Sequence, residues 1–132
     1  MMSYNNNGTN YLTTMNTTKL RIGTDCSGIE APLFALQKIK NKHPFFDYEH
    51  VFSSDIDPFV IKVHKENFSP KIMFQDITKR DVNSIPPIDI YIAGFPCQPF
   101  SKANKFQFET DERKQVFFRL NKLVGLELNN CL

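Results

Sequence analysis

Short apolar runs alternate with amphipathic stretches from residue 19 onward, and this alternation restricts the fold more than any other feature of the chain. Four runs have the length and residue types of strands: Lys19–Thr24, Val51–Ser54, Lys71–Phe74 and Asp89–Ala93. Strands that alternate with helices predict a mostly parallel sheet with helices on both faces. We therefore expect an α/β domain.

Capping residues predict where the helices begin and end. The first helix should start within Ile29–Ala31, because Pro32 is tolerated only in a first turn. Asp57, followed directly by a proline, should cap the second helix. Thr110 should cap the last helix and Gly125 should end it.

The length and composition indicate one domain without membrane or disulfide signals. The chain has 132 residues, a net charge of +2 and three cysteines at wide spacing. A nearly neutral charge neither requires nor excludes a nucleic-acid partner. The cysteine spacing suggests neither disulfides nor a zinc site, and no signal peptide or spanning segment is evident, so we expect a soluble, intracellular protein and no metal.

The first 18 residues differ in composition from the rest. They are rich in Asn and Thr and poor in large apolar side chains. Such a segment buries too little surface to offset its ordering entropy, so residues 1–18 are predicted to be disordered and residues 19–132 to form the domain.

Polar segments follow each predicted strand. These are Asp25–Gly28, Asp55–Asp57, Asp76 and Gly94–Ser101. In parallel sheets, ligands bind beyond the carboxyl ends of the strands, so these segments should converge on one site.

Each of these segments also has an ordinary structural interpretation. Ser27 and Gly28 could receive an anion at a helix N-terminus, or could form a simple turn. Asp55 could accept hydrogen bonds from ribose hydroxyls, and Asp76 from an adenine amino group, or each could cap a helix. For Asp57, the capping role is favoured.

Cys97 is the strongest candidate for chemistry. It lies between Pro96 and Pro99, which hold it in a stiff, non-helical turn at the ligand edge. A thiolate is a strong nucleophile, and a rigid turn positions it for attack. A small buried hydrophobe remains the default interpretation for Cys26 and Cys131.

The segment Gly94–Ser101 resembles the nucleophile motif of cytosine-C5 DNA methyltransferases, whose core is Pro-Cys-Gln. Three other segments are similar to that family's cofactor motifs in the same order: Thr24–Ala31, Ser54–Asp57 and Gln75–Thr78. The resemblance covers about residues 20–120. It implies a partial Rossmann-like methyltransferase fold, with S-adenosylmethionine as cofactor and DNA as substrate.

The resemblance also implies roles for individual residues. Cys97 would attack C6 of a flipped-out cytosine, which makes C5 able to accept the methyl group. The cofactor-binding residues would be Ser27, Gly28, Asp55, Ile56, Asp76 and Ile77. The residues near the substrate would be Pro96, Gln98 and Ser101.

Two departures from the family pattern stand out. Cys26 replaces an aromatic residue of the first motif, and Glu30-Ala31 replaces its glycine pair, as in phage and large-virus members of the family. The Glu-Asn-Val motif, whose glutamate holds the cytosine, does not follow Cys97. A truncated catalytic domain is therefore expected.

Several functions stay open at this stage. The chain could methylate cytosine in DNA, as in restriction–modification, with a second polypeptide that supplies the missing half. It could instead be an inactive fragment that at most binds cofactor or a partner, which is favoured for the isolated chain. RNA is an alternative substrate, since Pro-Cys-Gln also occurs in relatives that methylate transfer RNA. A nicotinamide-dependent oxidoreductase is disfavoured, because the G-x-G-x-x-G fingerprint is absent.

Overall fold

Four parallel strands form the centre of the molecule. The computed structural model describes residues 19–102 and 108–130, so the predicted disordered segment 1–18 and Cys131 lie outside the described part. The strands are β1 (Leu20–Asp25), β2 (Tyr48–Ser54), β3 (Ile72–Phe74) and β4 (Ile90–Ala93), in the sheet order β3-β2-β1-β4. The fold is α/β, as predicted, and is consistent with part of a Rossmann-like methyltransferase sheet.

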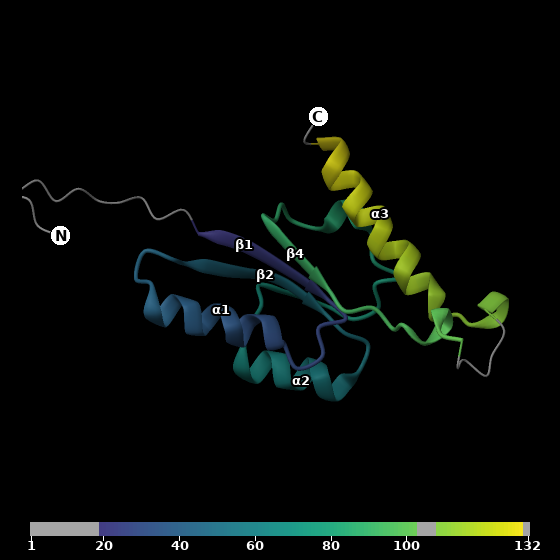
Figure 1. Ribbon diagram of the computed structural model, residues 1–132, viewed down its shortest axis with the longest axis horizontal. Helices are drawn as coiled ribbons and strands as arrows, with labels where there is room; N and C mark the ends of the chain where they lie inside the picture. The colour runs from purple at the N-terminus through teal and green to yellow at the C-terminus, as the bar shows by residue number, and fades with distance from the viewer. Residues whose placement is uncertain (1–18, 103–107, 131–132) are drawn as a thin grey trace, which may run out of the picture.

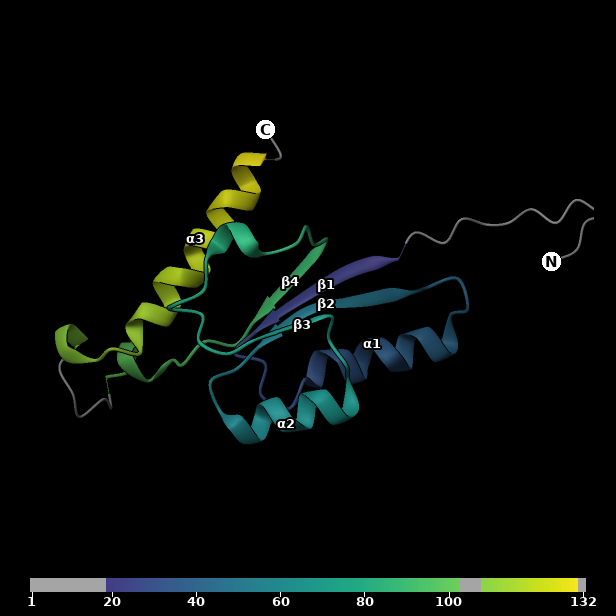
Figure 2. The same cartoon turned by 180° about the vertical axis from the view of Figure 1, so that it is seen from behind.

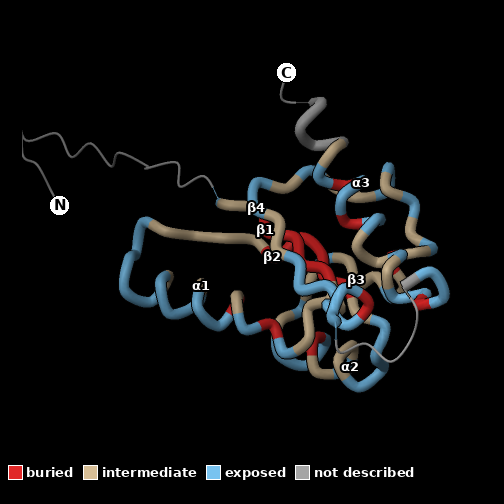
Figure 3. Tube along the Cα trace, turned by 45° about the vertical axis from the view of Figure 1, so that its right-hand side comes forward, coloured by how far each residue is buried: buried red, intermediate tan, exposed pale blue. Residues whose placement is uncertain are grey.

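Helices cover both faces of this sheet. Figures 1 and 2 show α1 (Ala31–Lys42) and α2 (Pro58–Asn67) side by side on one face, and α3 (Lys114–Asn130) on the other. Leu123 of α3 packs with Val51 and Phe52 of β2 in the apolar core. The buried stretches of the trace gather where β1 and β2 end (Figure 3). The buried ends of β1 and β2 therefore lie next to the edge where ligands bind in parallel sheets.

The ends of the strands are level with one another. Asp25, the last residue of β1, pairs with Ser54 of β2 and Ala93 of β4. Ser54 in turn pairs with Phe74, the last residue of β3. The segments that follow the four strands therefore emerge at one edge, as the sequence predicted.

Gly23 allows a close approach between β1 and β2. A Cβ atom at this position would lie 2.3 Å from a ring atom of Phe52, which is closer than real Cβ contacts. The Phe52 ring is fully buried, and the guanidinium of Arg80 lies 5.3 Å from its centroid. The absent side chain thus makes room for an aromatic ring against the strand.

The predicted helix starts were correct for α1 and α2, and the predicted limits of α3 were wrong. Asp57 accepts a hydrogen bond of 2.8 Å from the amide of Phe59 and so caps α2. Thr110 lies instead in a short 3₁₀ turn, and it is Asp111 whose carboxylate accepts from the amide of Arg113. Gly125 lies inside α3, which continues to Asn130.

Candidate functional site

A cavity of about 310 Å³ opens at the carboxyl edge of the sheet, and all four strand ends contribute to it. Its volume falls in the range of ~300–1,000 Å³ that is typical of small-molecule sites. Six predicted site residues line it: Asp55, Ile56, Asp76, Ile77, Pro96 and Gln98. Of the other five lining residues, only Val116 of α3 lies outside the segments that were expected at this site. The remaining four belong to those segments but were given no individual role: Cys26, Ser54, Gln75 and Gly94. The structure therefore brings together segments that are separated by more than sixty positions in the sequence.

The turn after β1 is wound into an unusual backbone shape. Cys26, Gly28 and Glu30 have positive φ angles of 51°, 51° and 56°. Only glycine adopts this region without cost, so Cys26 and Glu30 must be held there by their surroundings. The amide of Gly28 donates to a carboxylate oxygen of Asp55 at 3.0 Å, which ties the turn to the cavity.

Asp55 lies directly after β2, and each of its two carboxylate oxygens accepts a hydrogen bond from a different backbone amide. Its second oxygen accepts from the amide of Asp57 at 3.0 Å, so Asp55 orders the start of α2 as well as the turn after β1. The next residue, Ile56, has 73% of its surface exposed although it lines the cavity. A carboxylate beside an exposed aliphatic face suits a ligand with hydroxyl groups and a flat apolar ring.

Asp76 caps a turn and also lines the larger cavity. One of its oxygens accepts from the amide and the hydroxyl of Thr78, at 2.9 and 2.7 Å, and its other oxygen lies 3.4 Å from Lys79. These hydrogen bonds, that of the Thr78 hydroxyl above all, lower the pKa of Asp76. The residue therefore caps the turn that follows β3 and still lines the cavity.

Cys97 lies on an exposed turn at the rim of the cavity. Its carbonyl accepts from the amide of Phe100 at 3.0 Å, and Pro99 is buried beneath the turn. Its neighbours Pro96 and Gln98 line the cavity, while Cys97 and Ser101 are exposed and do not line it. This geometry leaves the thiol open to a large molecule that approaches from solvent.

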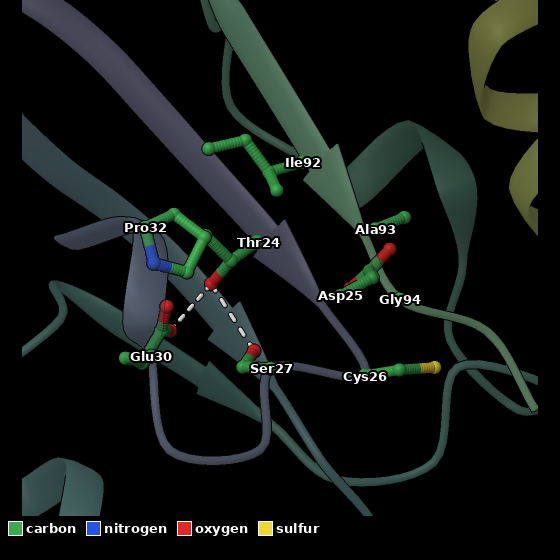
Figure 4. A pocket seen from close by; sticks show the side chains of 9 residues that line it. All are labelled: Thr24, Asp25, Cys26, Ser27, Glu30, Pro32, Ile92, Ala93 and Gly94. Atoms are coloured by element: carbon green, nitrogen blue, oxygen red, sulfur yellow. Dashed lines mark hydrogen bonds between the residues drawn. The ribbon is translucent and has the colours of Figure 1, made fainter. Parts of the chain in front are cut away.

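A smaller cavity of about 160 Å³ adjoins the first, on the other side of the β1 turn (Figure 4). Thr24, Ser27 and Glu30 line it and are joined by hydrogen bonds, while the side chain of Cys26 points away from them. Ser27 thus lines this smaller cavity, and Gly28 lines neither. The larger cavity thus contains six of the predicted site residues, whereas Ser27 and Gly28 lie in the turn beside it.

A buried ion pair lies beneath the site. Arg80 donates to both carboxylate oxygens of Asp25, at 2.7 and 2.6 Å, and its guanidinium also stacks on Phe74 at 4.9 Å. The hydroxyl of Tyr91 donates to Asp25 at 2.6 Å. Burial, and then the charge of Asp25, raise the pKa of Tyr91, so the phenol keeps its proton. Sequence reasoning missed this pair, because Arg80 has no local pattern that marks it.

The two described cysteines should differ in reactivity toward an alkylating reagent. Burial, together with the charges of Asp25 and Asp55, raises the pKa of the Cys26 thiol from 9.0 to about 11. At pH 8 its thiolate fraction should be roughly a hundredfold below that of an unperturbed thiol. We expect iodoacetamide to modify the exposed Cys97 well before Cys26, as mass spectrometry of tryptic peptides would show. Equal rates at the two positions would contradict the structure.

Two absences apply to the described residues alone. Residues 19–102 and 108–130 contain no group of three or more side chains that could hold a metal ion. Within the same ranges, no helix is both long enough and apolar enough to cross a membrane.

Comparison with known proteins places this site in a family. The model of the C-5 cytosine-specific DNA methylase family matches residues 25–126. The DNA (cytosine-5-)-methyltransferase DMT5 of Cryptococcus neoformans is 39% identical over a comparison of 113 residues that covers 74% of this chain and 5% of that protein. The type II methyltransferase M.NlaX of Neisseria lactamica is 40% identical over 80 residues, or 61% of this chain and 26% of that protein.

The type II methyltransferase M.DsaV of Dactylococcopsis salina gives a similar result, with 43% identity over 75 residues, or 57% of this chain and 23% of that protein. The matched segment is thus about a quarter or less of the length of each of these relatives. The family match itself covers most of the chain and includes every segment that lines the larger cavity. The chain belongs to the C-5 cytosine-specific DNA methylase family.

Proposed function

We propose that this chain provides the S-adenosylmethionine site and the nucleophilic thiol for methyl transfer to C5 of cytosine in DNA. The observation that carries the proposal is the 310 Å³ cavity, which has Asp55 and Asp76 on its walls and the Cys97 turn at its rim. The relatives above are named as a DNA (cytosine-5-)-methyltransferase and as type II methyltransferases, which supports DNA as the substrate.

The residues of the cavity fit the cofactor. The lining of the larger cavity includes two carboxylates, Asp55 and Asp76, and the exposed isoleucine Ile56. A carboxylate accepts hydrogen bonds from the paired hydroxyls of a ribose, and an aliphatic face packs against a purine ring. In this proposal Asp76 and Ile77, which follow β3 and line the same cavity, contact the other edge of the adenine.

The thiol and the cofactor site have separate tasks in this proposal. S-adenosylmethionine supplies the methyl group. Cys97 adds through its sulfur to C6 of an extruded cytosine, and the displaced ring electrons make C5 nucleophilic. Pro96 and Gln98 hold the turn between the two sites, and Ser101 lies at its end. Once C5 carries the methyl group, solvent takes up the C5 proton, and the electrons of that C–H bond re-form the C5–C6 double bond and expel Cys97 as a thiolate.

Calorimetric titration with S-adenosylmethionine tests the cofactor site. In Asp55→Asn the side chain keeps its shape but loses the charge that accepts two ribose hydroxyls. We expect binding to weaken by about ten- to a hundredfold, since a hydrogen bond to a charged group contributes ~1.5–3 kcal/mol.

Asp57→Asn is the matched control for this titration. Asp57 lies two residues away, caps α2 and does not line the cavity. Asparagine caps a helix as well as aspartate does, so this variant should bind like the wild type. Equal affinities for wild type and Asp55→Asn, or no binding by a folded wild-type chain, would contradict the proposed cofactor site.

A further inference from the structure

A chain of three buried polar side chains lies beneath the turn after β1, on the face that α1 and α2 cover. Glu30, Ser53 and His64 are each fully buried. The Ser53 hydroxyl lies 2.7 Å from Oε1 of Glu30 and 2.9 Å from Nδ1 of His64, while the Glu30 and His64 atoms are themselves 4.0 Å apart. Ser53 is therefore the only direct bridge between them among the described contacts.

The contact between His64 and Gly28 shows which nitrogen of the His64 ring carries a hydrogen. Its Nε2 atom lies 2.7 Å from the carbonyl oxygen of Gly28. A carbonyl oxygen only accepts, so Nε2 must carry a hydrogen. If His64 is neutral, its Nδ1 atom is then an acceptor, and Ser53 must donate to it.

A count of hydrogens then shows that these three side chains lack one proton when Glu30 is ionised and His64 is neutral. Ser53 has a single hydroxyl hydrogen, and with Glu30 ionised and His64 neutral both of these partners are acceptors. The third partner of Ser53, the hydroxyl of Ser27 at 2.7 Å, can donate to Ser53 but supplies no hydrogen to either of these contacts. One of two short contacts would lack a hydrogen, which is costly for buried polar atoms. One added proton satisfies both contacts. It lies either on Nδ1 of His64, with Ser53 donating to Glu30, or on Oε1 of Glu30, with Ser53 donating to His64.

We propose that Glu30, Ser53 and His64 share one retained proton and act as positioning residues that hold the turn Cys26–Glu30 in the shape required for cofactor binding. The expected effect on cofactor binding rests on the proposed function, because Asp55 lines the proposed cofactor cavity. Gly28 is held at both ends: its amide donates to Asp55 and its carbonyl accepts from His64. The shared proton thus influences the position of the Asp55 carboxylate through one residue, Gly28.

The positive φ angles of this turn explain why these buried hydrogen bonds are needed. Cys26 and Glu30 occupy a backbone region that non-glycine residues leave unless their surroundings restrain them. The buried side chain of Glu30 supplies this restraint, because it accepts a hydrogen bond from Thr24 at 2.6 Å and lies 2.7 Å from the hydroxyl of Ser53 (Figure 4 shows the Thr24 contact).

The neighbouring histidine does not hold the extra proton. Nε2 of His50 lies 3.5 Å from Glu30, and its Nδ1 atom is buried without a partner. Burial lowers the pKa of His50, which favours its neutral form. The arrangement also differs from a hydrolase triad, because Ser53 is buried and bridges two partners, so it cannot reach a substrate.

Nuclear magnetic resonance of the ligand-free 132-residue chain tests the proton directly. At about pH 8, well above the ordinary histidine pKa of about 6.5, we expect one of two signatures. Either both ring nitrogens of His64 carry hydrogen, or the Glu30 carboxyl carbon shows the shift of a protonated acid. A neutral His64 beside an ionised Glu30 would overturn the proposal. This measurement needs no cofactor, so its failure is distinct from failure of the proposed function.

Ser53→Ala tests the consequence for the site. It removes the bridging hydroxyl alone, and we expect S-adenosylmethionine to bind about ten- to a hundredfold more weakly, as for one buried polar group left without its partner. Ser84→Ala, which removes an exposed hydroxyl far from the turn, should bind like the wild type. If Ser53→Ala folds and binds as the wild type does, the positioning role is wrong. If it does not fold, the resonance measurement on the wild type decides alone.

Discussion

Replacing Arg80 with methionine is expected to lower the free energy of unfolding by about 3–5 kcal/mol, the cost of leaving one partner of a buried ion pair without the other. Methionine retains much of the apolar contact with Phe52 and Phe74 but removes both hydrogen bonds to Asp25. Since small domains are stable by only about 5–15 kcal/mol, this loss should be evident in urea unfolding followed by circular dichroism.

The chain contains a second arginine–aspartate pair that serves as the control. Arg21 also donates to both oxygens of Asp89, at 3.1 and 2.8 Å, but this pair is partly exposed to solvent. Arg21→Met should therefore cost much less than Arg80→Met. Adding Asp25→Asn to Arg80→Met should restore part of the lost stability, because the uncompensated charge is removed. Equal losses for the two arginine variants would show that burial does not set the strength of the inner pair.

The sequence predicted most of the fold because its signals are local. Short apolar runs identified all four strands, and an aspartate followed by proline identified the start of α2. The errors in α3 have equally local causes. Thr110 and Asp111 are adjacent and both suit an N-cap, so spacing alone does not decide between them. A glycine in a helix interior costs only about 1 kcal/mol relative to alanine, so the packing of Leu120 and Leu123 can carry the helix past Gly125.

The cavity walls were predictable for a related reason, and the groups beneath them were not. Parallel strands bring their carboxyl ends to one edge, so residues such as Asp55 and Asp76 could be assigned to a site from their position alone. Ser53 and His64 have no such marker, because their role depends on which face of a strand or helix meets Glu30. The sequence around His64 does not indicate a polar contact, whereas the structure buries the whole ring and places Ser53 and the carbonyl of Gly28 against its two nitrogens.

Cys97→Ser is expected to have the largest effect on activity. A serine hydroxyl is a far weaker nucleophile than a thiolate toward C6 of cytosine, so methyl transfer should fall by about 10⁴-fold or more. Cys97 does not line the cofactor cavity, so the affinity for S-adenosylmethionine should stay within about twofold of the wild type. Transfer of a labelled methyl group is measured on DNA and RNA in parallel, with the chain alone and with a chimera that joins residues 25–126 to the remaining segments of the Neisseria lactamica relative.

Cys26→Ser is the control that separates the nucleophile from a general effect of thiol loss. Cys26 lines the cavity, but its raised pKa keeps it protonated, so a serine at this position should leave most of the methyl transfer intact. If Cys97→Ser keeps activity within tenfold of the wild type, another group must be the nucleophile. If it loses transfer and cofactor binding together, the substitution has disturbed the cofactor cavity through the Pro96–Pro99 turn, and the loss of transfer is then no evidence that Cys97 is the nucleophile. Loss of transfer with binding preserved is the pattern that a thiol at the rim of the cofactor site requires, because the sulfur then acts on the base alone.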